Sequence, residues 1–73
     1  MDNEETILKD KFQTLALNNI KSNDSSITFN TYWENNNYRL AYLVLSEHME
    51  KEGLKFNSDE EKTNENFYWL FVN

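Results

Sequence analysis

The segment FNSDEEKTNENFYW, residues 56–69, decides how the end of this chain folds. Its polar middle lies between two hydrophobic runs, GLKF before it and FYWLFV after it. Short apolar runs on either side of a polar stretch favour a β-hairpin. We therefore predict strands at residues 54–57 and 66–72. The hairpin loop between them is acidic and carries four carboxylates: Asp59, Glu60, Glu61 and Glu65.

The start of the chain has the periodicity of an amphipathic helix over residues 2–21. Its apolar residues recur at spacings of three and four: Ile7, Leu8, Phe12, Leu15, Ala16 and Ile20. Asp2 or Asn3 is expected to cap it. The β-branched and aromatic residues of SITF, residues 26–29, then favour a short strand.

A second helix is expected from Thr31, because Thr31 and Glu34 have the spacing of a capping box. Three consecutive asparagines at 35–37 have poor helix propensity and predict a break in this helix. Gly53 is the only glycine in the chain. We predict that the helix ends there in the left-handed conformation, with Leu54 folding back onto Met49.

This order of helix, strand, broken helix, strand, hairpin loop and strand predicts a single α+β domain over residues 1–73. The last strand is apolar on both faces, since Tyr68, Leu70 and Val72 alternate with Phe67, Trp69 and Phe71. One small domain covers one of these faces. A homodimer or a tight partner is therefore predicted along Tyr68, Leu70 and Val72, or along the opposite face.

Composition narrows the class of partner. The 73 residues include 13 acidic and 7 basic side chains, which gives a net charge of -6. This charge argues against unaided binding to nucleic acid or to an anionic membrane and favours a basic partner. There is no cysteine, which suits a reducing compartment.

The sequence has few residues suited to catalysis. Without cysteine, and with His48 as the single histidine, thiol chemistry is excluded and any histidine-dependent triad must use His48. His48 lies on the apolar stripe of the second helix, where a structural role is expected, and His48 with Glu52 supplies only two metal ligands. One glycine does not make a phosphate-binding loop. We predict a protein that is not an enzyme, without cofactor or metal.

The stretch LVLSEHMEKEGLKF, together with the returning FYWLFV, resembles the recognition helix, turn and wing of winged-helix domains. The resemblance implies that residues 37–52 and the hairpin loop face a ligand. In this chain both elements are acidic, and carboxylates spaced along them can imitate DNA phosphates. The predicted partner-binding residues are Glu47, Glu50, Glu52, Asp59, Glu60, Glu61 and Glu65.

The small, acidic, Asn-, Lys- and Ile-rich composition resembles early bacteriophage proteins that inhibit their host, including DNA mimics that bind the replication sliding clamp. The resemblance implies an inhibitor in the bacterial host cytoplasm that occupies the DNA site of a basic host protein. One alternative is a winged-helix transcriptional regulator that binds DNA through Lys9, Lys11, Lys21, Arg39 and Lys55. Another is a toxin–antitoxin or assembly module that uses the aromatic strand.

Overall fold

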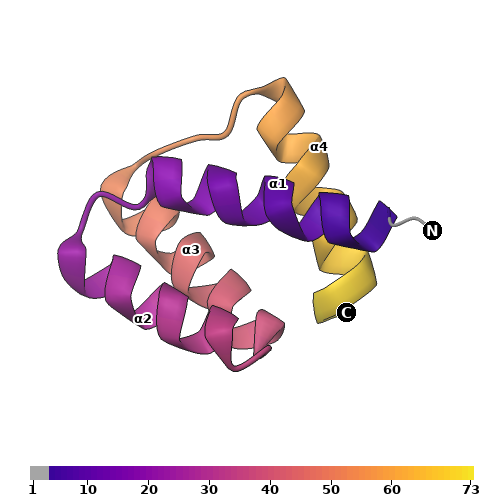
Figure 1. Ribbon diagram of the computed structural model, residues 1–73. Helices are drawn as coiled ribbons and strands as arrows, with labels where there is room; N and C mark the ends of the chain where they lie inside the picture. The colour runs from indigo at the N-terminus through magenta and orange to yellow at the C-terminus, as the bar shows by residue number, and fades with distance from the viewer. Residues whose placement is uncertain (1–3) are drawn as a thin grey trace.

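The computed structural model describes residues 4–73, and 83% of them are helical. Four α-helices are followed by one π-helical turn: α1 (Glu4–Asn19), α2 (Asn23–Glu34), α3 (Tyr38–Glu52), α4 (Ser58–Phe67) and η1 (Tyr68–Val72). No strand occurs between residues 4 and 73 (Figure 1). The predicted α+β fold with a winged-helix order is therefore wrong, and the chain is a small all-helical domain.

The predicted acidic hairpin is the beginning of α4. Asn57 accepts a hydrogen bond from the backbone N–H of Glu60 at 2.8 Å, and the Glu60 carboxylate accepts one from the backbone N–H of Asn57 at 3.1 Å. This reciprocal pair is a capping box, which satisfies two of the backbone donors that a helix start leaves free. Asp59, Glu60 and Glu61 occupy the first turn, where the helix dipole favours negative charge. The acidic residues thus start a helix instead of forming a loop.

The predicted last strand continues α4 into η1, so its side chains do not alternate between two faces. Phe67 and Phe71 are four residues apart and have ring centroids 4.9 Å apart, as expected for one side of a helix. The wider π-helical turn closes with a hydrogen bond from Asn73 N–H to the Tyr68 carbonyl at 2.8 Å. In the helical conformation, one side of this aromatic run packs against the core of the same chain.

The predicted strand at 26–29 lies inside α2. Ser22 caps this helix, since its hydroxyl accepts a hydrogen bond from the Ser25 N–H at 3.3 Å. Phe29 and Trp33, four residues apart, stack with ring centroids at 5.4 Å, whereas a strand would separate them. Thr31 is in the middle of the helix, where its hydroxyl donates to the carbonyl of Ile27 at 2.9 Å. The predicted capping box at Thr31 and Glu34 is therefore also wrong.

Three local predictions are confirmed. The first helix forms, although Asp2 and Asn3 lie outside the described residues. The asparagines at 35–37 separate α2 from α3, with Asn36 at φ 60° and Asn37 capping α3. Gly53 ends α3 at φ 67°, and the Leu54 N–H returns to the Met49 carbonyl at 2.9 Å.

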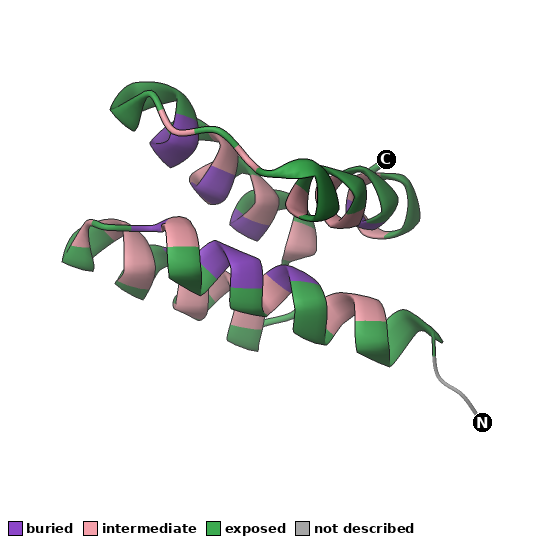
Figure 2. Ribbon diagram, turned by 90° about the horizontal axis from the view of Figure 1, so that it is seen from above, coloured by how far each residue is buried: buried purple, intermediate pink, exposed green. Residues whose placement is uncertain are grey.

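The helices pack in pairs, α2 against α3 and α1 against α4, while η1 contacts α3. Buried residues lie where the helices face one another (Figure 2). Phe12 and Phe67 stack at the centre with ring centroids 3.9 Å apart, and Trp33 stacks on both. Such aromatic pairs add to the stabilisation from burial alone. This core joins α1, α2 and α4 across the full length of the chain.

Within residues 4–73, none of the helices combines the length and the apolar character needed to cross a membrane.

Candidate interaction surface

The carboxylates predicted on the long helix lie at the end of α3, and all three, Glu47, Glu50 and Glu52, are exposed. Glu47 and Glu52 line a shallow groove of about 330 Å³ between the start of α2 and the end of α3. Asp24 and Lys51 line the same groove. This end of the domain is therefore mainly acidic.

The carboxylates predicted in the wing lie on α4. Asp59, Glu61 and Glu65 are exposed, whereas Glu60 is only half-exposed. Besides closing the capping box, Glu60 accepts a hydrogen bond from the Asn19 side chain at 3.3 Å, which joins the start of α4 to the end of α1. Glu60 thus has a structural role that the other three do not share among the described contacts.

The connection at residues 53–57 joins the helices that carry the two acidic groups. It runs from the end of α3 to the start of α4 (Figure 1). Five residues span at most about 17 Å when fully extended. We call the six exposed carboxylates on the two helices that flank this connection the acidic edge: Glu47, Glu50, Glu52, Asp59, Glu61 and Glu65.

Helix dipoles distinguish the two halves of the acidic edge. Asp59 and Glu61 lie in the first turn of α4, where negative charge stabilises the helix. Glu50 and Glu52 lie in the last turn of α3, where the carbonyl groups make negative charge unfavourable. The stability of α4 accounts for the first pair. It does not account for the second pair, nor for Glu34, a single exposed acid in the last turn of α2. The pair at the end of α3 is the larger group of this kind and is therefore the candidate for a functional surface.

His48 is 5% exposed and serves the packing of the domain. Its Nε2 accepts a hydrogen bond from the Lys21 backbone N–H at 3.0 Å, which holds the turn between α1 and α2 against α3. Acceptance by Nε2 places the proton of the neutral ring on Nδ1. Across residues 4–73 there is no group of three or more His, Cys, Asp or Glu side chains arranged to hold a metal ion.

The three residues predicted as a dimer or partner face have different environments. Val72 is buried, Tyr68 is half-buried against the Tyr42 ring, and Leu70 is 53% exposed. The predicted strand would place Trp69 and Leu70 on opposite faces. In the structure they are neighbours near the start of η1, and both are exposed. A helical spacing applied to FYWLFV would have placed Phe67 and Phe71 inside and identified this exposed pair.

Of the five basic residues named for DNA binding, Lys9 is held against the aromatic side chains of the domain. The Lys9 ammonium lies 5.3 Å from the centroid of the Tyr38 ring and 5.6 Å from that of Phe71. Lys21 is exposed and donates to the nearby Asn18 carbonyl at 3.0 Å. The winged-helix fold on which the regulator alternative rested is absent from residues 4–73.

No family model, curated protein or solved structure matches this chain.

Proposed function

We propose that this protein is a non-enzymatic inhibitor whose acidic edge binds the nucleic-acid-binding surface of a basic protein. The observation that carries the proposal is the pair Glu50 and Glu52, which are exposed at a helix end where their charge opposes the helix dipole. Selection for stability alone favours neutral or basic residues there. Binding to a basic surface is a reason to keep carboxylates in that place.

The physical basis is long-range attraction followed by many weak contacts. A net charge of -6 on so small a domain speeds encounter with a positively charged surface. Single exposed ion pairs contribute roughly 0.2–1 kcal/mol, so the six carboxylates have to act together. Their attraction is screened over about 8 Å at physiological ionic strength, and binding should therefore weaken steeply with salt.

The target class follows from the charge and from the resemblance to small acidic phage inhibitors. A bacterial replication sliding clamp, whose central channel is basic, is the first target to test. Other DNA-binding proteins of replication, transcription or defence fit the same chemistry. The proposed place of action is the bacterial cytoplasm.

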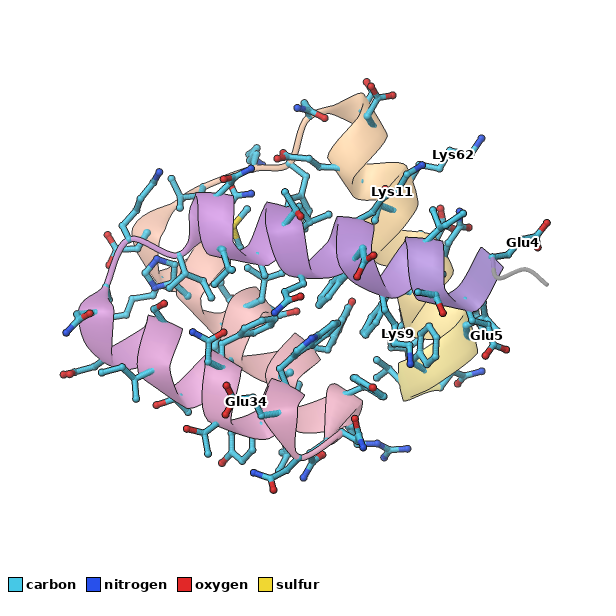
Figure 3. The ribbon with its side chains drawn as sticks, in the orientation of Figure 1. Glu4, Glu5, Lys9, Lys11, Glu34 and Lys62 are labelled. Atoms are coloured by element: carbon cyan, nitrogen blue, oxygen red, sulfur yellow. The ribbon has the colours of Figure 1, made fainter. Side chains whose placement is uncertain are left out.

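The test is displacement of duplex DNA from a purified target, either the sliding clamp or a basic protein recovered from bacterial lysate. Glu50→Gln/Glu52→Gln should weaken displacement severalfold and raise the melting temperature slightly, because two unfavourable charges leave the end of α3. The matched control is Glu5→Gln/Glu34→Gln. It removes the same number of charges, one from the start of α1 and one from the end of α2 (Figure 3).

Equal effects of the two double variants would show that only total charge matters and would remove the assignment to the acidic edge. Simultaneous binding of DNA and this protein to the target would contradict mimicry altogether. Circular dichroism of every variant separates a loss of binding from a loss of fold.

A further inference from the structure

A second surface of the molecule is apolar and lies between α1, η1 and the end of α4, where Asn66, the neighbour of Glu65, is part of its lining. Ile7, Trp69 and Leu70 are 55%, 61% and 53% exposed and line a groove of about 450 Å³ between α1 and η1. Leu8 forms part of its floor, and Glu4 and Lys11 lie along its α1 side. Three neighbouring large apolar side chains at such exposure are typical of an interaction site.

The α1 side of this groove is one helical stripe with an ordered charge pattern. Glu4, Ile7, Leu8 and Lys11 follow the spacing i, i+3, i+4, i+7, which places them on one face. The stripe extends over about 10 Å, with the acidic residue at one end and the basic residue at the other. In Figure 3, Lys11 extends toward Lys62 of α4, whereas Lys9 leaves the other side of α1.

This pattern is complementary to itself. When two copies of the stripe meet antiparallel, about a two-fold axis between Ile7 and Leu8, the apolar pairs meet at the centre. Glu4 of each copy then faces Lys11 of the other, because the two residues lie at equal distances in sequence from the axis. Such an arrangement is an isologous contact, in which the same patch serves both partners.

We propose that this groove is the contact between two copies of the chain, with Ile7, Leu8, Trp69 and Leu70 as its apolar centre and two reciprocal Glu4–Lys11 pairs at its rim. An acidic partner or a basic partner satisfies only one end of the stripe. A second copy satisfies both ends at once. The contact differs from the strand face expected from the sequence, since Val72 takes no part and Trp69 does.

The apolar centre is tested by comparing two matched variants in sedimentation velocity over a concentration series. The parent should shift from monomer to dimer as concentration rises. Leu70→Glu should raise the dissociation constant at least tenfold, because the contact would bury an unpaired carboxylate. Ile27→Glu, at a side chain of similar exposure (57%) on α2, should leave it unchanged.

The rim is tested by charge reversal. Glu4→Lys and Lys11→Glu should each raise the dissociation constant about tenfold, since two attractive pairs become repulsive. Mixing the two single variants restores both pairs and should restore dimers as heterodimers. The variant with both reversals in one chain should self-associate like the parent. This rescue does not depend on the stability of either variant, which a thermal melt records separately.

A parent that stays monomeric at every concentration overturns the proposal and leaves the groove to a different partner, such as an apolar helix. Dimers that respond to Ile27→Glu but not to Leu70→Glu overturn it as well. Failure of the mixed single variants to associate, with both folded, rejects the antiparallel arrangement. Recovery of dimers in that mixture, together with loss in each variant alone, supports it.

Discussion

Glu60 offers the sharpest test of why residues 57–61 start a helix. Its carboxylate accepts hydrogen bonds from the Asn57 N–H at 3.1 Å and from the Asn19 side chain at 3.3 Å. Glu61 follows it in the same turn, is exposed, and shares the helix dipole. Substitution of either residue by alanine removes one charge from one turn. Only Glu60→Ala removes the capping box.

The expected magnitudes follow from these contacts. Loss of the favourable charge–dipole interaction costs about 0.3–1 kcal/mol and applies to both variants. Loss of a helix-capping contact adds about 1 kcal/mol for Glu60→Ala. For a domain of this size, 1 kcal/mol corresponds to a fall in melting temperature of about 4–8 °C. Glu60→Ala should therefore melt several degrees below Glu61→Ala.

Glutamine separates the hydrogen bond from the charge. A glutamine at the third helical position still accepts from the capping residue. Glutamine has one acceptor oxygen, so Glu60→Gln keeps the bond from Asn57 but loses the bond from Asn19. It should therefore melt slightly below Glu61→Gln and clearly above Glu60→Ala, measured by circular dichroism at 222 nm under the same conditions. Equal melting of Glu60→Ala and Glu61→Ala would refute the capping role. A loss in Glu60→Gln as large as that in Glu60→Ala would show that the hydrogen bond to the Asn57 N–H does not start the helix.

Two further predictions concern single residues. Gly53→Ala should lower the free energy of unfolding in urea by about 1 kcal/mol, because φ is 67°. An added Cβ meets nothing within 4 Å, so this penalty comes from the backbone conformation alone. Gly53→Asn should cost less, and an unchanged stability of Gly53→Ala would contradict the left-handed end of α3. His48→Leu should cost about 1–3 kcal/mol because the Lys21 N–H loses its acceptor. His48→Gln, which keeps an acceptor, should recover part of that loss, and equal losses in both variants would show that ring packing dominates.

Local signals in the sequence predicted the structure correctly where a residue type strongly prefers one backbone conformation. Three asparagines interrupted the helix, and Asn36 adopted the positive φ that asparagine tolerates. The single glycine ended α3 as expected. The apolar periodicity of residues 4–19 was also sufficient, with Phe12, Leu15 and Ala16 buried in the core. Each of these signals acts within one turn of its own residue.

The prediction for residues 54–72 is wrong because this segment fits two patterns, that of a β-hairpin and that of a capped helix. A polar segment between apolar runs satisfies a hairpin pattern, but Asn57 and Glu60 have the spacing of a capping box with acids in the first turn. In FYWLFV every residue is apolar, so neither period is visible in the sequence alone. Tertiary packing distinguishes the two: Phe67 stacks on Phe12, and the helix brings the Phe71 ring within 4.9 Å of Phe67 while it leaves Trp69, which a strand would place on the same side, 61% exposed.

The two proposed surfaces are compatible because of where the chain places them. The groove lies beside the first turns of α1 and the first half of η1, whereas the connection between α3 and α4 begins at the far end of α1 (Figure 1). A dimer through the groove places only Glu65 beside the contact, and it leaves the carboxylates at the end of α3 and the start of α4 free in both copies, so that the dimer is one bivalent ligand. Two linked weak sites bind an extended or symmetric basic surface far more tightly than one site does. Leu70→Glu should therefore weaken DNA displacement even though it leaves all six carboxylates of the acidic edge in place, and full displacement by this monomeric variant would show that one acidic edge is sufficient.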